Sequence, residues 1–445
     1  SILVHIKTAS SPPLPLILLM DASTLRAGRV NGLVNPHHSL GSQRNLTKPT
    51  VKRFARKFGA AGLFQLRSNW MKNIRETTMK FMKLFSVLAM AGYIILSSSV
   101  AAAQPNILFI VSDDHGWGDL PSNWDNTEVR LPTLEDLATR GVRFSNYHTV
   151  PLCGPSRACM FTGQFSTENG MWRGPGKAPL GSPGYRGIKR DVIMLSEHLS
   201  RAGYHTGCFG KWHMGSLEGE VPNDRGFDEF HGFLAGAHSY WITPKRSKIM
   251  HNRKPDSTSE GHATELFTGW AEQFIRESVG KYEPFFCYLA YNAVHSPLQG
   301  ADAYMKKFEH IENIQRRIFA AMLAHLDDSV GAVLAELRKQ GLEKNTLVIF
   351  LSDNGGPTRE LTSSNAPLRA GKGSVYEGGL RVPFMMQWPG RLPAGKVYKL
   401  PIISLDLFAT AAAIAKAPLK RRIDGVNLMP YLAGINKDTP HAALF

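Results

Sequence analysis

Two apolar segments that each end in acidic residues constrain the fold of this 445-residue chain more than any other feature. Pro105–Ser112 is followed by Asp113-Asp114, and Thr346–Ser352 is followed by Asp353-Asn354. A continuous apolar run of this length is typical of a strand that is buried on both faces of a parallel sheet. Ligand sites of open α/β sheets lie outside the carboxyl ends of such strands, so the two acidic ends are expected to converge.

Strand and helix signals alternate along the rest of the chain from residue 104 onward. Pro132–Arg140 has a proline at its start and Gly141 after its end, which predicts a helix. Val192–Arg201, Gln315–Lys339 and Leu405–Ala415 are also predicted helices. This alternation predicts an α/β fold in which helices cover both faces of a mostly parallel central sheet.

The two strand ends supply three carboxylates and one amide oxygen, from Asp113, Asp114, Asp353 and Asn354. These are hard ligands, which suit Ca²⁺ or Mg²⁺, whereas zinc would require His or Cys ligands. Asp-Asp and Asp-Asn-Gly-Gly are also common in caps and turns. The two matching strand ends, together with a cysteine motif at residue 153, favour a metal site over that alternative.

The segment Cys153-Gly-Pro-Ser-Arg157, followed by Thr162-Gly163, resembles the signature of the sulfatase family. In that family the cysteine is oxidised to formylglycine, whose hydrated aldehyde attacks sulfur, and the Pro-x-Arg part is needed for the modification. Taken alone, the segment could equally be a buried cysteine beside a proline turn. The resemblance implies that Cys153 is converted, with a formylglycine-generating or sulfatase-maturating enzyme as a partner.

Further segments match the family's motifs in the expected order: Gly210–Gly215, Asn292–Pro297 and Leu368–Pro383. The resemblance implies that Lys211 and Arg157 hold the formylglycine oxygens and offset the charge of the sulfate. His213 is the candidate base for regenerating the aldehyde, because histidine titrates near neutral pH.

Two more residues are assigned to the substrate by the same resemblance. His295 follows the apolar run Phe285–Ala290 and is implied to contact the sulfate and the leaving oxygen, as a binding group or a general acid. Lys372 lies in a glycine-rich segment and is implied to bind sulfate. The family uses such strand ends for one calcium ion, and the implied metal set is Asp113, Asp114, Cys153, Asp353 and Asn354.

The resemblance extends from about Gln104 to Phe445 and implies the alkaline-phosphatase-like sandwich, with hydrolysis of aryl or carbohydrate sulfate esters as the activity. The substrate is expected to be a sulfated small molecule or glycan. Family members usually continue into a C-terminal antiparallel subdomain, so residues 104–445 are expected to be a truncated catalytic domain. A phosphatase of the same superfamily would use Ser or Thr as nucleophile, which the cysteine disfavours. A non-catalytic sulfated-glycan binder, or an inactive truncated homologue, stays open.

Positive charge is concentrated at the start of the chain. The formal net charge is +16, and residues 1–78 hold twelve Lys/Arg against two Asp/Glu. Lys80 and Lys83 raise that leader to +12, which leaves +4 for the remainder. Because the excess charge belongs to the leader, a nucleic-acid partner is not predicted for the folded part.

Residues 79–103 have the pattern of a secretory signal peptide. Met79–Lys83 is positively charged, Leu84–Val100 is mostly apolar, and Ala101–Gln104 offers small residues at a cleavage position. An uncleaved membrane anchor is the alternative, since about 20 apolar residues span a bilayer, and membrane contact is expected only in that case. A signal peptide predicts an exported protein, periplasmic or secreted, with residues 1–78 as a non-native, disordered upstream extension.

Overall fold

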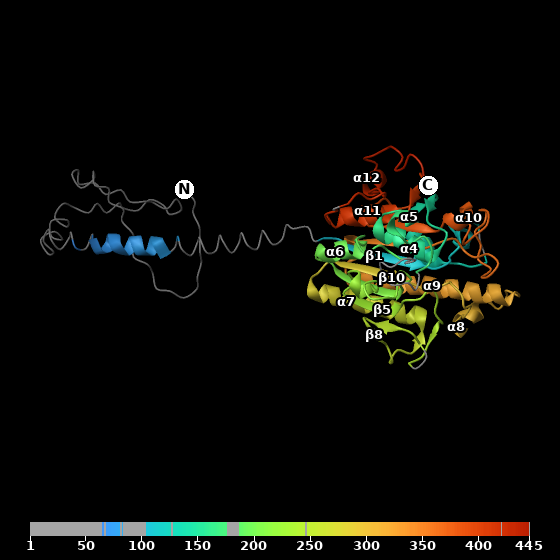
Figure 1. Cartoon of the computed structure of the whole chain (residues 1–445). Helices are drawn as coiled ribbons and strands as arrows, with labels where there is room; N and C mark the ends of the chain where they lie inside the picture. Colours follow the sequence, from blue (N-terminus) through green and yellow to red (C-terminus); the bar gives the residue numbers. More distant parts are fainter. Residues whose placement is uncertain are drawn as a thin grey trace, which may run out of the picture. The chain divides into compact units, whose positions relative to one another are not determined.

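The computed structural model describes residues 65, 68–80, 82, 104–125, 128–175, 187–244, 247–419 and 421–444. The chain divides into two compact units, Ser1–Ala102 and Ala103–Phe445. In the first unit, residues 68–80 are helical with exposed side chains (Figure 1). The remainder of the predicted upstream extension and of the predicted signal sequence or anchor, apart from Gln65 and Met82, lies outside the described residues, so both stay predictions.

Strands and helices alternate along the second unit. Its described strands are β1 (Asn106–Ser112), β2 (Val142–Phe144), β3 (Tyr147–His148), β4 (His205–Lys211), β5 (Glu229–Phe233), β6 (Trp241–Ile242), β7 (Met250–His251), β8 (Lys254–Pro255), β9 (Gly261–His262), β10 (Phe285–Ala290), β11 (Thr346–Ser352), β12 (Phe384–Gln387), β13 (Lys396–Tyr398) and β14 (Ile402–Ile403). Its described α-helices are α3 (Pro132–Arg140), α4 (Cys153–Thr162), α5 (Ser166–Asn169), α6 (Leu195–Arg201), α7 (Ala263–Lys281), α8 (Asp302–Met305), α9 (Ile314–Lys339), α10 (Glu377–Leu380), α11 (Leu405–Ile414) and α12 (Met429–Leu432).

Within the described residues, ten strands form one sheet in the order β13-β2-β12-β11-β1-β10-β4-β5-β7-β8. The central strands β11, β1, β10, β4 and β5 all run parallel to one another. β12 and β7 pair antiparallel on the two sides of this parallel core. The predicted α/β fold with a mostly parallel sheet is therefore confirmed, and the two acidic strand ends belong to adjacent strands, β1 and β11.

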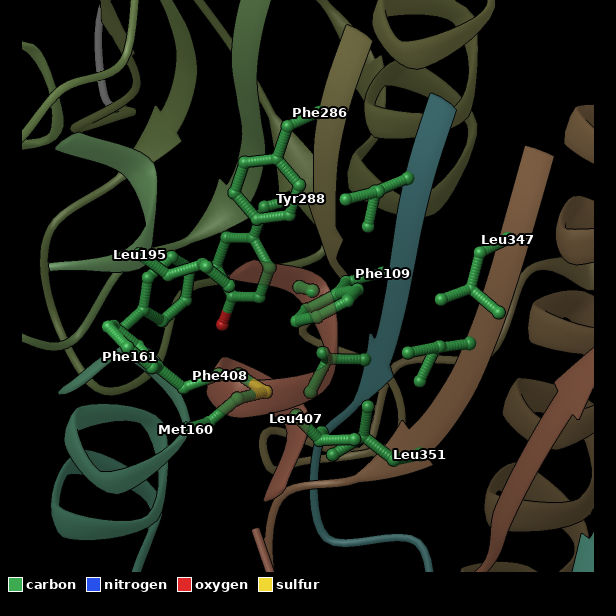
Figure 2. Packing of buried hydrophobic residues seen from close by; sticks show 14 of the residues in the cluster. Phe109, Met160, Phe161, Leu195, Phe286, Tyr288, Leu347, Leu351, Leu407 and Phe408 are labelled. Atoms are coloured by element: carbon green, nitrogen blue, oxygen red, sulfur yellow. The ribbon is translucent and has the colours of Figure 1, made fainter. Parts of the chain in front are cut away.

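Helices cover both faces of the sheet (Figure 1). Side chains alternate along a strand, so Ile107, Phe109 and Val111 of β1 pack on one face while Leu108 and Ile110 pack on the other. The first face packs against α4, α6 and α11, and the second against α3, α7 and α9. Figure 2 shows Phe109 among side chains of the first face. Burial on both faces explains why the β1 sequence is apolar without interruption.

Helix α9 is long and apolar enough to cross a membrane by length and composition alone, and no other described helix is. However, 72% of its most apolar window is buried inside the fold, where α9 packs against α7 and α3. Its apolar character is therefore that of a core helix. The helix predicted over Gln315–Lys339 is confirmed, and it begins one residue earlier because the Asn313 side chain accepts a hydrogen bond from the Arg316 backbone N–H at 2.9 Å.

Candidate active site

Four neighbouring parallel strands carry predicted site residues to one edge of the sheet. In strand order these are Asp353 and Asn354 after β11, Asp113 and Asp114 after β1, His295 after β10, and Lys211 and His213 at the end of β4. Because the carboxyl ends of parallel strands lie on the same side, residues from distant parts of the sequence meet there.

Cys153 is the first residue of α4, and its sulfur lies 3.5 Å from Asp113 Oδ1. The first N–H groups of a helix have no partner within it, and Pro155, in the first turn, has no N–H to satisfy. Gly154 fits a crowded position, since a Cβ there would lie 3.0 Å from Met171 Cε and 3.3 Å from the His213 carbonyl oxygen. The helix N-terminus adds partial positive charge beside Cys153.

Arg157 is fully buried one turn further along α4. Its Nε and Nη2 atoms lie 2.9 and 2.8 Å from Asp353 Oδ2, and Nη1 donates to Tyr288 Oη at 2.9 Å and to the Lys211 carbonyl at 3.1 Å. The other oxygen of Asp353, Oδ1, lies 3.4 Å from the backbone nitrogen of Asp114. Arg157 therefore directs its charge at a predicted metal ligand.

Two lysines pair with the two carboxylates that follow β1. Lys211 Nζ contacts Asp113 Oδ2, and Lys372 Nζ lies 2.8 Å from Asp114. Burial alone would raise the pKa of Asp113, but Lys211 and then His295 hold it well below its ordinary value. Burial and the neighbouring Asp113 raise the pKa of Asp114. Additional positive charge beside this pair would stabilise both ionised carboxylates.

The carboxylate and amide oxygens of the site fit a hard divalent cation, and a cysteine and a histidine lie beside them. Ligand atoms of Asp113, Asp114, Cys153 and His295 all lie within 4.8 Å of one another. Asn354 donates through Nδ2 to Asp114 Oδ1 at 2.7 Å, and its Oδ1 atom is buried without a hydrogen-bond partner. A buried carbonyl oxygen without a partner requires an explanation, and an ion is one. Carboxylate and amide oxygens are the ligands that Ca²⁺ and Mg²⁺ prefer.

His213 has a left-handed backbone conformation, with φ of 56°. Burial of the ring, and then the charges of Lys211 and Arg157, lower the pKa of His213 well below its ordinary value. This lowering favours the neutral form of the ring, which is the form that accepts a proton. Gly236 leaves the space that this ring occupies, because a Cβ there would lie 2.7 Å from His213 Nε2.

His295 is oriented by its own turn. Its Nδ1 atom lies 2.8 Å from the Ser296 carbonyl oxygen, which can only accept, so Nδ1 carries a proton. Its Nε2 atom faces Asp114 Oδ2 at 3.5 Å. The Ser296 hydroxyl donates to Glu360 Oε1 at 2.8 Å and so ties this turn to the segment after β11. The ring thus presents Nε2 to the carboxylates of the site.

A pocket of about 330 Å³ contains the reactive groups. Cys153, His213, His295 and Lys372 line it, and the remaining lining residues are small or apolar: Leu152, Gly154, Pro155, Gly174, Gly236 and Ala237. Four of the six predicted catalytic residues therefore share one pocket. The other two are fully buried cations that contact carboxylates and are not among the lining residues.

Sequence reasoning missed residues that hold the site from outside the pocket. Asn365 is one: its Oδ1 accepts from the Gly356 backbone N–H at 3.0 Å, and its Nδ2 donates to the carbonyls of Gly356 and Ala370 at 2.7 and 3.1 Å. These bonds close the loop that carries Lys372. The polar turn sequence before this loop is a signal for such a role. Tyr240 is another: its hydroxyl donates to the carbonyl oxygens of Asn292 and His295 at 2.7 and 2.9 Å.

The sequence model of the Sulfatase family matches residues 105–417 of this chain, a range that contains every predicted site residue. The mostly parallel sheet and the residues gathered at its carboxyl edge agree with that match. The chain therefore belongs to the sulfatase family. Membership supports sulfuric ester hydrolysis as its enzyme class.

Two curated relatives of this chain are sulfatases as well. Arylsulfatase J of Mus musculus is 32% identical over 75% of this chain, and N-acetylgalactosamine-6-sulfatase of Mus musculus is 33% identical over 80%. The chain spans 56% of the length of the first and 71% of the second. The crystal structure of Ps i-CgsB in complex with k-i-k-neocarrahexaose is 37% identical, with a TM-score of 0.70 and coverage of 76% of this chain and 78% of that chain. The predicted sandwich fold is thus confirmed.

Proposed function

We propose that this chain hydrolyses sulfate esters, with formylglycine at position 153 and one bound calcium ion. The observation that carries the proposal is that Cys153, His213, His295 and Lys372 line one pocket beside a cluster of carboxylates. Burial raises the pKa of the Cys153 thiol well above its ordinary value. Because the thiolate is the nucleophilic form of cysteine, the unmodified side chain is poorly suited to attack sulfur, which favours conversion.

Formylglycine would supply a hydrated aldehyde as the nucleophile, and calcium would supply positive charge to the sulfate oxygens. The chain's own residues supply charge compensation and proton handling. Lys372 and the N-terminus of α4 offset the negative charge of the sulfate. His295 is the proposed proton donor to the leaving oxygen, and His213 is the proposed proton acceptor within the pocket. Lys211 and Arg157 fix the carboxylates that would bind the metal.

The substrate is proposed to be a sulfated glycan or a sulfated small molecule. The oligosaccharide bound to Ps i-CgsB, and the sugar sulfatase among the curated relatives, favour a glycan. A formylglycine-generating enzyme is the proposed maturation partner, and export is proposed from the signal-like sequence of residues 79–103.

The full chain, produced together with a formylglycine-generating enzyme, provides the direct test. Release of inorganic sulfate would be measured from an aryl sulfate and from sulfated oligosaccharides, alongside binding of the same oligosaccharides. Catalytic release supports the proposal. Binding without release, in a chain whose Cys153 has been converted, would instead favour the non-catalytic glycan-binding alternative.

Calcium is expected to raise the unfolding midpoint of the metal-stripped chain, because an ion that binds only the folded state stabilises it by about 2.7 kcal/mol at a hundred times its Kd. Asp114→Asn should lose most of this shift, since it removes a buried carboxylate of the cluster. Asp136→Asn, at an exposed position of α3, should retain it. Thermal unfolding with added Ca²⁺ or Mg²⁺ checks this, and an unchanged wild-type midpoint with both ions would contradict the metal site.

A further inference from the structure

The turn that carries His295 is held by a tyrosine hydroxyl from another part of the chain. We infer that Tyr240 is a positioning residue for His295 and acts through its phenol group. The inference rests on the proposed sulfatase reaction, in which His295 serves the leaving oxygen.

The contacts of the Tyr240 hydroxyl are confined to this turn. Its Oη atom lies 2.7 Å from the Asn292 carbonyl oxygen and 2.9 Å from the His295 carbonyl oxygen. Both acceptors are backbone atoms, so the hydroxyl donates its single proton to the two ends of one four-residue turn. Tyr240 has 0% exposure, so these bonds are shielded from bulk solvent.

Tyr240 is itself held firmly at the backbone. Its N–H donates to Gln299 Oε1 at 2.8 Å, and its carbonyl accepts from the Ala263 N–H at 2.7 Å. Asn292 returns a bond to the same segment through Nδ2, which donates to the His238 carbonyl at 2.8 Å. Because the Tyr240 backbone is anchored in this way, its hydroxyl can hold the turn in position.

The opposite side of the turn is tied to the carboxylate cluster. Asp113 N donates to the Ala293 carbonyl, and Val294 N donates to the Asp113 carbonyl, each at 2.8 Å. With Tyr240 on one side and Asp113 on the other, the turn is held in two places, and His295 Nε2 lies 3.5 Å from Asp114 Oδ2. Loss of the phenol anchor would release one side only, which permits a small displacement of His295 without unfolding.

The segment that carries Tyr240 also shapes the position of the second histidine. Gly236 and Ala237 line the pocket, and Gly236 leaves the space taken by His213. The short segment 236–240 therefore contacts the surroundings of both His213 and His295. This makes Tyr240 a better candidate for a positioning role than a buried tyrosine that contacts only a helix.

Tyr240→Phe tests the inference because it removes one oxygen atom and keeps the buried ring. Tyr291→Phe is the matched control: Tyr291 is equally buried, and its hydroxyl contacts Thr268 Oγ1 of α7 at 2.8 Å. With the matured full chain and a sulfated oligosaccharide, Tyr240→Phe should lower kcat by about tenfold or more and change KM by less than about twofold. Tyr291→Phe should leave both constants near wild type.

A second readout separates positioning of His295 from general loosening of the fold. A nitrophenyl sulfate has an acidic leaving group that needs little help from a proton donor, so Tyr240→Phe should affect it less than the sugar sulfate. An equal loss on both substrates, or an unchanged kcat, would overturn this inference but leave the proposed function standing. Absence of turnover in the matured wild-type chain would overturn the proposed function and this inference with it. The unfolding midpoints of both variants would be measured to check that the two variants are equally stable.

Discussion

Replacing Cys153 with alanine is expected to abolish sulfate release by the matured chain, with kcat lowered by at least about a thousandfold. Alanine cannot be converted to formylglycine, so the pocket would retain its charges and histidines but lose its nucleophile. Sulfate release from an aryl sulfate measures the effect. In the wild-type chain, the peptide that contains Cys153 should weigh about 18 Da less than the thiol form, which is the difference between CH₂SH and CHO.

Cys159→Ala is the matched control for this prediction. Cys159 lies in the same helix and is also buried, but it does not line the pocket, and burial raises the pKa of its thiol to about 12. Its replacement should leave kcat unchanged. Trypsin cleaves after Arg157 and separates the two cysteines, so the mass change can be assigned to one of them. Sulfatase turnover retained by purified Cys153→Ala would refute the nucleophile assignment.

Arg157→Leu is expected to lower the free energy of unfolding by about 3–5 kcal/mol, because it removes one partner of a buried ion pair. Leucine fills part of the space, but Asp353 loses two close guanidinium contacts and Tyr288 Oη loses its donor. Sulfate release should fall as well, since the Asp353 carboxylate would lose its charged partner. Urea unfolding, followed by circular dichroism, measures the stability change.

An exposed arginine provides the comparison. Arg140 of α3 pairs with Glu343 at 2.5 Å and with Asp136 at 3.5 Å, but these side chains are partly solvated. Surface ion pairs contribute little, so Arg140→Leu should change the unfolding midpoint only slightly. If Arg157→Leu proved as stable as Arg140→Leu, the buried pair with Asp353 would not be a stabilising element of the site.

Much of the fold was predictable because its signals are local. The apolar runs of β1 and β11 indicate strands that are buried on both faces. The helices α3, α9 and α11 lie where periodicity and end signals predict them. The start of α6 was predicted wrongly: the helix begins at Leu195 and not at Val192. The Met194 N–H donates to Glu197 Oε2 at 2.8 Å. A methionine side chain gives no N-cap signal in the sequence.

The pairing of charges within the site could not be predicted. From the sequence, Lys211, Lys372 and Arg157 were all predicted to face the sulfate. In the structure each of them contacts a carboxylate, because a buried charge needs a close partner of opposite sign. The partners lie far apart along the chain, so no spacing reveals which cation faces which carboxylate.

The placement of Cys153 also bears on when the chain can be activated. Cys153 is 5% exposed and lies at the start of helix α4, which packs on one face of the sheet. A modifying enzyme needs access to that segment, and the strands that flank β1 come from much later in the sequence. If position 153 is converted as proposed, conversion is expected before those strands join, and a refolded chain offered to the enzyme should stay unconverted. Each molecule would be committed to activity or inactivity once, before its fold is complete.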